Sequence, residues 1–195
     1  MLYERKNTSG RDLAFKVQNY LIELEGVRER KLTTTTVRSE QREGELWESI
    51  QFDAAFDINN SRSASGTVAR GQNGEIAVSK STLHSNVSSL FVAEALACLE
   101  ATKLGIIIGF NSVTIMGDSK TIINKCKTEA RDKSVLGAIM DDIQNNKTRF
   151  QKIVFRFIQR TENAKTHNLE KEALRKGEGS YLVGETREEL NLGGR

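Results

Sequence analysis

Between residues 48 and 57, the segment ESIQFDAAFD alternates between apolar and polar side chains, and this alternation constrains the fold more than any other feature. Ile50, Phe52 and Ala54 fall on one side and Asp53 on the other, which is typical of a β-strand with one face in a core. Two short segments with strand-like composition follow, on either side of Gln72-Asn73-Gly74. Because Asn-Gly is a strong hairpin signal, we expect three consecutive antiparallel strands.

The rest of the domain alternates between helical and strand patterns. We predict helices at about 89–104, 119–129, 134–147 and 163–176, and strands at 112–117 and 151–159. Three strands followed by alternating helices and strands are typical of an α/β domain, in which helices cover both faces of a mixed sheet.

The N-terminal segment has a different pattern. Residues 11–25 carry apolar side chains at helical spacing, and residues 27–45 are polar and rich in charge and threonine. We therefore divide the chain into an amphipathic helix and linker (1–46), a folded domain (47–182) and a flexible C-terminal tail (183–195). The helix at 11–25 could pack on the domain itself or bind a protein partner.

Composition narrows the class of protein. No apolar run approaches the roughly 20 residues needed to span a bilayer, and the N-terminus MLYERKNTSG lacks the apolar stretch of a secretory signal. We expect a monomeric intracellular protein, nuclear or cytoplasmic, that is neither secreted nor bound to a membrane. Cys98 and Cys126 lack metal-site spacing and are predicted to be buried free thiols.

Positive charge is concentrated in the C-terminal half. Residues 119–176 contain 14 Lys and Arg against 7 Asp and Glu, whereas the whole chain has a net charge of only +3. This half could present a phosphate-binding surface, or its lysines could simply cover solvated helix faces.

Glu94 is out of place in the helix predicted at 89–104. Its neighbours three and four residues away are Leu90, Phe91, Ala97 and Cys98, so its face of the helix is apolar. A carboxylate on such a face is costly unless a cation or strong donors meet it; alternatively, Glu94 lies near the helix end and reaches solvent. Glu100 lies where an exposed charge is expected.

Asp53 and Asp118 are the other two candidate carboxylates. Asp is unfavourable inside a strand, although Asp53 could lie at the surface end of the sheet. Asp118 lies between a strand and a helix in MGDSK, where it could be an ordinary helix cap. Since sites gather at the carboxyl ends of parallel strands, both could meet Glu94. Three carboxylates would invite Mg²⁺, with Mn²⁺ as the alternative ion, for phosphodiester hydrolysis.

Four segments in order, QFDAAFD, AEALACLEATKLG, VTIMGDSKTIINKC and FRFIQRTENAKTHNLEKEAL, resemble the ribonuclease H-like domains of plants that are related to reverse transcriptases of non-LTR retroelements. The resemblance covers residues 47–181. It implies a five-stranded mixed sheet with strand order 3-2-1-4-5, and Mg²⁺-dependent hydrolysis of the RNA strand of an RNA–DNA hybrid.

The resemblance also implies roles for individual residues. It implies that the metal ligands are Asp53, Glu94 and Asp118, that His167 is the fourth catalytic residue, and that Ser119, Arg160 and Asn163 contact nucleic acid. Active ribonucleases H usually have an aspartate at the fourth position. A histidine there removes one negative charge, so we expect a weaker second metal and lower activity; alternatively, His167 is a surface residue.

Two further departures favour a second function. Phe91 stands where well-studied ribonucleases H have an asparagine that contacts the hybrid, and the loop at 127–134 lacks their histidine. The alternative is therefore a non-catalytic nucleic-acid-binding or interaction module derived from a retroelement ribonuclease H domain.

Overall fold

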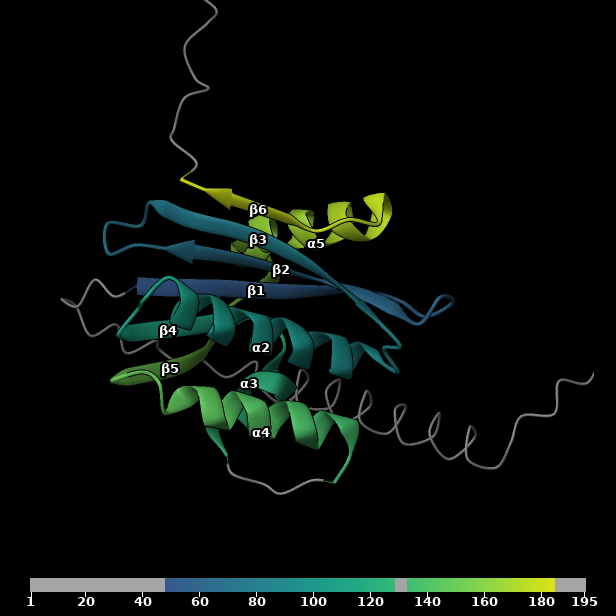
Figure 1. Ribbon diagram of the computed structural model, residues 1–195, viewed down its shortest axis with the longest axis horizontal. Helices are drawn as coiled ribbons and strands as arrows, with labels where there is room; N and C mark the ends of the chain where they lie inside the picture. The colour runs from purple at the N-terminus through teal and green to yellow at the C-terminus, as the bar shows by residue number, and fades with distance from the viewer. Residues whose placement is uncertain (1–47, 129–132, 185–195) are drawn as a thin grey trace, which may run out of the picture. The chain divides into compact units, whose positions relative to one another are not determined.

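A six-stranded mixed sheet forms the centre of the domain in the computed structural model, which describes residues 48–128 and 133–184 (Figure 1). The strand order is β5-β4-β1-β2-β3-β6. The strands are β1 (Glu48–Asp57), β2 (Arg62–Arg70), β3 (Ile76–Ser85), β4 (Ser112–Gly117), β5 (Lys152–Phe157) and β6 (Ser180–Val183). The first three strands form the predicted antiparallel meander, and β4 and β5 run parallel to β1.

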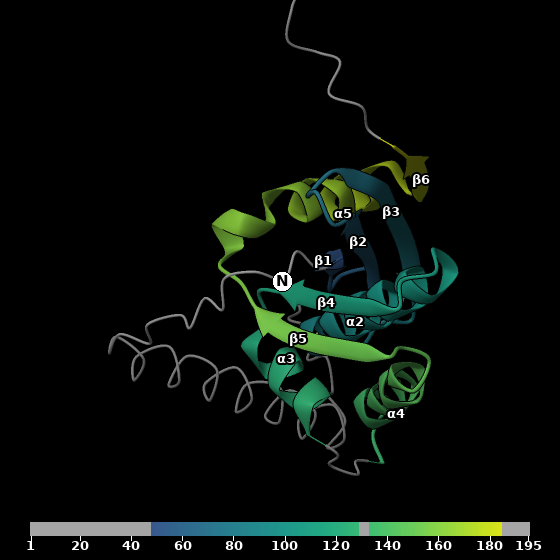
Figure 2. The same ribbon diagram turned by 90° about the vertical axis from the view of Figure 1, so that its left-hand side faces the viewer.

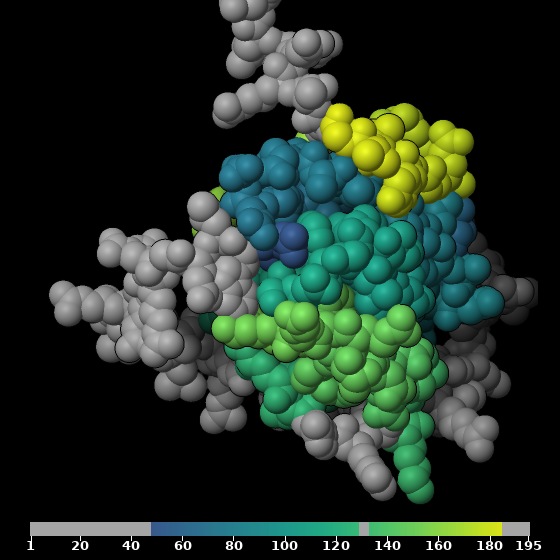
Figure 3. All heavy atoms as spheres, turned by 60° about the vertical axis from the view of Figure 1, so that its left-hand side comes forward, coloured from purple at the N-terminus to yellow at the C-terminus, as the bar shows by residue number. Residues whose placement is uncertain are grey.

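The prediction of five strands was wrong, because β6 adds a sixth. It pairs antiparallel with β3, from Ser81–Ser180 to Val78–Val183, and the hydroxyl groups of Ser81 and Ser180 lie 2.8 Å apart. Gly177 caps the last helix of the domain and has a left-handed backbone (φ 74°). After this cap the chain turns to run along β3. In Figure 3 the last described residues, in yellow, form an outer edge of the domain beside β3.

Helices cover the two faces of the sheet, as predicted. They are α2 (Leu90–Ile107), α3 (Lys120–Lys127), α4 (Val135–Lys147), the short 3₁₀ helix η1 (Arg160–Asn163) and α5 (Ala164–Lys176). Helix α2 packs on β1 and β2 and against α4, whereas α5 packs on β1, β2 and β3. Figure 2 shows α5 and α2 on opposite sides of these strands.

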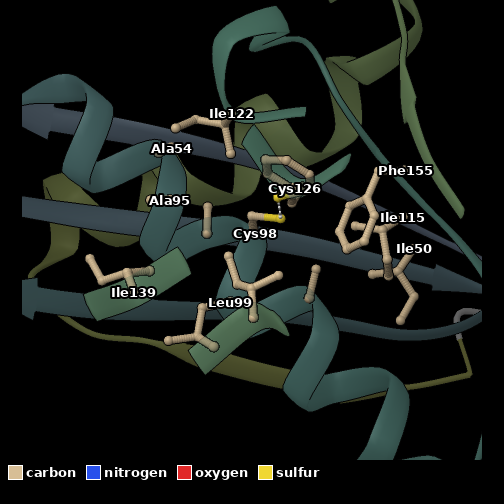
Figure 4. Close-up of a cluster of buried hydrophobic side chains, with 14 of the residues drawn as sticks. Ile50, Ala54, Ala95, Cys98, Leu99, Ile115, Ile122, Cys126, Ile139 and Phe155 are labelled. Atoms are coloured by element: carbon tan, nitrogen blue, oxygen red, sulfur yellow. Dashed lines mark hydrogen bonds between the residues drawn. The ribbon is translucent and has the colours of Figure 1, made fainter. Parts of the chain in front are cut away.

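The main hydrophobic core lies between the sheet and α2, and contains the apolar side of β1. Ile50 and Phe52 are fully buried there, which confirms the period-two interpretation of this strand. Cys98 of α2 and Cys126 of α3 are both buried free thiols, as predicted. Their sulfur atoms lie 3.6 Å apart in the cluster shown in Figure 4.

Glu100 is buried, so the expectation of an exposed charge was wrong. Its side chain is 11% exposed and forms ion pairs with Lys80 (2.8 Å) and Lys103 (3.2 Å). Lys80 comes from β3, and its side chain reaches Glu100 on α2. The pairing depends on a contact between distant segments, which helix periodicity alone does not reveal.

Several predictions fall on other parts of the chain. The helix at 11–25, the linker at 27–45 and the tail residues from 185 onward lie outside the described residues. Among the helices in the two described ranges, none combines the length and apolar character required to cross a membrane.

Candidate metal centre

The candidate site lies where two parallel strands separate. The register between β1 and β4 ends at the pair Gln51–Met116. Asp53 and Asp118 each follow two residues beyond that pair, so both carboxylates flank the opening between the strands. Asp53 is almost fully buried, and the side chain of Asp118 is 10% exposed. This location at the carboxyl ends of neighbouring parallel strands is a common place for a functional site.

Glu94 reaches the same point from helix α2. The helix begins after Ser89, whose hydroxyl accepts a hydrogen bond from the backbone N–H of Val92 (3.2 Å). Glu94 lies in the second turn. One carboxylate oxygen from each of Asp53, Glu94 and Asp118 can be chosen so that all three lie within 4.8 Å of one another. The structure thus brings together the three predicted metal ligands.

Glu94 presents an unsatisfied oxygen to this cluster. Its Oε2 atom is shielded from solvent and has no hydrogen-bond partner among the described residues. Burial raises the pKa of Glu94 well above its ordinary value, and the nearby Asp53 and Asp118 raise it further. Buried polar atoms normally have partners, and a cation beside Asp53 and Asp118 could provide one for this oxygen.

Asp53 is held in place through both of its oxygens. Oδ1 accepts a hydrogen bond from the backbone N–H of Ala54 (2.9 Å), and Oδ2 lies 3.0 Å from Nδ1 of His167. Burial and the charge of Asp118 raise the pKa of Asp53, while the hydrogen bonds from Ala54 and His167 lower it and only partly offset that effect. The carboxylate therefore has a fixed orientation but still lacks a full countercharge.

His167 joins the site from the first turn of α5. Its side chain is 19% exposed, and Nη2 of Arg160 lies 3.1 Å from Nε2. Nη2 of Arg160 also lies 3.3 Å from Nδ1. Arginine can only donate hydrogen bonds, and the tautomer with the proton on Nδ1 gives Arg160 an acceptor at Nε2 and Asp53 a donor at Nδ1. His167 therefore lies beside Asp53 and not on the solvent-exposed face of the helix.

Glu170 is a site residue that the sequence reasoning missed. It is 1% exposed, and Oε1 lies 2.9 Å from Nδ1 of His167. Among the residues that the structure describes, neither of its oxygens has a hydrogen-bond partner. Burial and the charge of Asp53 raise the pKa of Glu170 to about 8. The available signal was its spacing, three residues after His167 on the same helix face.

Gly66 allows α5 to lie close enough to the sheet for these contacts. It pairs with Asp53 across β1 and β2. A Cβ atom at this position would overlap the backbone carbonyl of Thr166 and would lie 3.2 Å from the backbone nitrogen of Glu170. Because Gly66 has no side chain, the backbone of α5 can lie directly on β2, beside Asp53 of the neighbouring strand.

The three predicted nucleic-acid contacts occupy different environments. Arg160 is exposed (66%), and Nη1 lies 4.0 Å from Oδ2 of Asp118. Ser119 is partly exposed at the N-cap of α3, but its side chain makes no capping hydrogen bond. Asn163 is fully buried and donates a hydrogen bond to the carbonyl of Phe52 (2.8 Å). A direct contact between Asn163 and nucleic acid is not supported, because its amide fastens the start of α5 to β1.

The donor set fits a hard divalent cation. Mg²⁺ and Mn²⁺ are bound by carboxylate oxygens, and Asp53, Glu94 and Asp118 supply three such groups in a partly closed site. Burial first, and then the neighbouring Asp53 and Asp118, raise the pKa of Glu94, and a bound cation would offset both effects. These residues could therefore hold an ion at the opening between β1 and β4.

Comparison with solved structures shows the same fold in three ribonuclease H proteins. The chain superposes on ribonuclease H1 from the archaeon Halobacterium salinarum with a TM-score of 0.61 and 21% identity, covering 66% of this chain and 98% of that one. The chain also superposes on LC11-RNase H1 from compost, solved in complex with an RNA/DNA hybrid, with a TM-score of 0.61 and 21% identity; the match covers 67% of this chain and 98% of that one. For the N-terminal RNase H domain of a Mycobacterium tuberculosis protein, the TM-score is 0.61 and the identity is 16%, and the match covers 67% of this chain and 95% of that one.

The amino-acid sequence also matches the model of a protein family. The reverse transcriptase-like family matches residues 51–173, which include every residue of the candidate site. No curated protein matches the chain. On the strength of the family match and the shared fold, the chain belongs to the reverse transcriptase-like family and contains a ribonuclease H-like domain.

Proposed function

We propose that this domain binds nucleic acid and hydrolyses the RNA strand of RNA–DNA hybrids in a reaction that depends on a divalent cation, Mg²⁺ or Mn²⁺. The observation that carries the proposal is the cluster of Asp53, Glu94 and Asp118, with the unpartnered Oε2 of Glu94 inside it. When bound there, a divalent cation would polarise a phosphate and activate a water for in-line attack. Carboxylates in this arrangement make a serine, cysteine or histidine nucleophile unnecessary.

The chain's own residues prepare the site for such an ion. Asp53 is oriented by Ala54 and His167, and Glu94 is carried on a helix whose start is fixed by Ser89. Asp118 follows Gly117, where a Cβ atom would overlap the ring of Phe52, so β4 packs tightly on β1 just before the site. Rigid elements therefore hold all three carboxylates in place, which is the preorganisation that catalysis requires.

Positive charge next to the carboxylates supports binding of a phosphate backbone. Arg160 is exposed beside Asp118, and residues 119–176 carry 14 Lys and Arg against 7 Asp and Glu. Phosphate contacts of this kind fix position without reading base sequence. Selection of an RNA strand would then rest on helix shape and 2′-hydroxyl contacts. One structural neighbour of this fold was solved with an RNA/DNA hybrid, which supports the choice of substrate.

The test is cleavage of a labelled RNA–DNA hybrid by the purified full chain. We expect the RNA strand to be cut in Mg²⁺ or Mn²⁺ and to stay intact in EDTA. Asp118→Asn should abolish cleavage, whereas Asp141→Asn, an exposed aspartate on α4, should leave it unchanged. Equal residual cleavage by the wild type and by Asp118→Asn would show that the activity does not come from this site.

A second candidate function is favoured by His167. The resemblance to plant and retroelement-related domains implies that His167 stands at the fourth catalytic position, where active ribonucleases H usually have an aspartate, so the site would hold less negative charge. The domain would then bind nucleic acid without cleaving it. Binding that weakens steeply with added salt, without cleavage in either metal, would support this second function over the first.

A further inference from the structure

An open pocket of about 480 Å³ lies between the end of β1 and helix α5. On the strand, its lining begins at Ala55, two residues after Asp53. On the helix, it begins at Lys171, one turn after His167, and ends at Arg175. Because Asp53 and His167 lie only 3.0 Å apart, this β1–α5 pocket lies directly beside the candidate metal centre.

Lys171 and Arg175 give the pocket a positive side. Both residues are exposed, and among the described residues neither forms an ion pair with a carboxylate. Of the acidic residues next to them on α5, Glu170 is buried and Glu172 pairs with Lys176. Four helical residues separate the two cations, which is about 6 Å along the helix axis. That spacing is close to the distance between neighbouring phosphates in a nucleic-acid strand.

Asp57, the acidic residue of the lining, is engaged by its own turn. Its Oδ1 atom accepts hydrogen bonds from the backbone N–H groups of Asn59 (3.1 Å) and Asn60 (3.2 Å). Its Oδ2 atom accepts a hydrogen bond from the side chain of Asn60 (2.6 Å) and lies 3.6 Å from Arg62. The charge of Asp57 is therefore balanced within the turn, and the cations of α5 stay available to an anion.

Apolar side chains complete the lining. Phe56 and Leu174 are partly exposed, and Ile58 is 74% exposed. Cations that follow a phosphate backbone, beside aromatic and aliphatic groups that the bases contact, are the components of a single-strand binding site. In a paired strand the faces of the bases are covered by their stacked neighbours, so only an unpaired nucleotide could reach this lining.

We propose that the β1–α5 pocket binds unpaired nucleotides of the RNA strand, next to the hybrid that the metal centre cleaves. Lys171 and Arg175 contact two successive phosphates. One base lies against the apolar lining of Phe56, Ile58 and Leu174. The inference rests on the proposed function, because it requires the RNA strand to lie at the metal centre. It adds to that function a preference for hybrids that continue into single-stranded RNA near the point of cleavage.

Binding without cleavage tests this preference. Fluorescence anisotropy in EDTA compares the affinity of the untagged full chain for a blunt hybrid with its affinity for the same hybrid carrying a few unpaired nucleotides on the RNA strand, at either end. An extension at one end should raise the affinity at least about 5-fold, since a base on an aromatic side chain contributes about that much or more. The same extension on the DNA strand should not raise it.

The double variant Lys171→Gln/Arg175→Gln should remove this gain. On the extended hybrid, the slope of log Kd against log salt should also fall by about 1.4, since each single-strand phosphate contact contributes about 0.7. Lys133→Gln/Arg149→Gln removes the same charge from exposed positions on either side of α4. Helix α4 packs on α2, across the sheet from α5 (Figure 2), so this control should keep the gain. Ile58→Ser should reduce the gain without changing the slope.

The outcomes separate this inference from the proposed function. The inference is overturned if no extension of the RNA strand raises the affinity, if a DNA extension raises it equally, or if Lys171→Gln/Arg175→Gln keeps the gain. Cleavage of the blunt hybrid that requires Asp118, together with any of these results, would leave the proposed function intact. A gain that depends on Lys171 and Arg175, without cleavage in Mg²⁺ or Mn²⁺, would support the inference and refute the proposed hydrolysis.

A competing peptide gives a further outcome. Two cations beside apolar groups could also receive an acidic peptide. If polyglutamate displaces the extended hybrid at lower concentration than single-stranded RNA does, and this displacement is lost in Lys171→Gln/Arg175→Gln, the pocket belongs to an acidic protein partner and the inference is overturned. Displacement by single-stranded RNA at the lower concentration supports it.

Discussion

The buried carboxyl group of Glu170 should make the metal-free protein less stable as pH rises. Its pKa is about 8 in the folded chain, against an ordinary value of 4.5. Because the folded-state pKa is raised, the stabilising contribution is fully present below pH 4.5 and is lost as pH rises through 8. Since each pH unit between the two values is worth about 1.4 kcal/mol, the loss is about 1 kcal/mol at pH 5 and about 3 kcal/mol at pH 7.

Glu170→Gln removes this titration and should therefore stabilise the metal-free protein. The free energy of unfolding of Glu170→Gln, relative to that of the wild type, should increase by about 2–3 kcal/mol between pH 5 and pH 7. The measurement is urea unfolding in EDTA, followed by circular dichroism, with each protein measured at both pH values. Glu170 is 1% exposed, so screening by solvent reduces this figure little.

A matched variant isolates the effect of burial. Glu172 lies two residues farther along the same helix, where it is exposed and pairs with Lys176 (2.6 Å). Glu172→Gln should show no comparable dependence on pH. If Glu170→Gln and the wild type lose or gain stability in parallel from pH 5 to pH 7, then Glu170 titrates normally in the folded state and the reasoning is refuted.

Three other predictions concern packing and charge. Gly66→Ala should destabilise the domain by about 1–3 kcal/mol, because its Cβ would overlap α5; an unchanged melting temperature would mean that α5 shifts at no cost. Glu100→Gln should cost about 1–3 kcal/mol at pH 7 and less at pH 3. Burial alone would raise the pKa of Glu100, but the ion pairs with Lys80 and Lys103 outweigh burial and lower the pKa. The stabilisation that ionised Glu100 provides is therefore lost as pH falls. If Glu100→Gln lowers the free energy of unfolding equally at pH 7 and pH 3 in urea, this explanation is wrong. Ile143→Ala, at a fully buried position, should cost about 2–5 kcal/mol, whereas Val135→Ala, at an exposed one, should stay within about 0.5 kcal/mol.

The main elements could be predicted because their signals are local. The alternation in residues 48–57 and the Asn-Gly hairpin define β1 to β3 within a few residues. Glu94 was also recognisable, since its apolar neighbours Ala97 and Cys98 are indeed buried. Leu90, in the first turn, is instead half exposed. An acidic residue on a buried helix face was a sound reason to expect a partner group.

The missed features depend on contacts between distant segments. Strand β6 has only four residues, too few for a periodic pattern, and it is defined by its pairing with β3. Glu170 was overlooked because the buried face of α5 is not apolar. Its buried residues are Thr166, Glu170 and Ala173, whereas the larger Leu169 and Leu174 are only partly buried. Small and polar residues face the sheet there because Gly66 has no side chain, which lets the helix backbone lie close to the strand and leaves little room for large side chains.

The contact between Asp53 and His167 joins residues 114 positions apart, and this separation links ion binding to local unfolding. This contact joins the first strand of the domain to its last helix. An ion held by both would bind only while α5 is docked, so it would stabilise the docked state by mass action. Amide hydrogens of α5 should then exchange with solvent more slowly when Mn²⁺ is present. The undocking of a single helix would thereby become a readout of site occupancy that requires no nucleic acid.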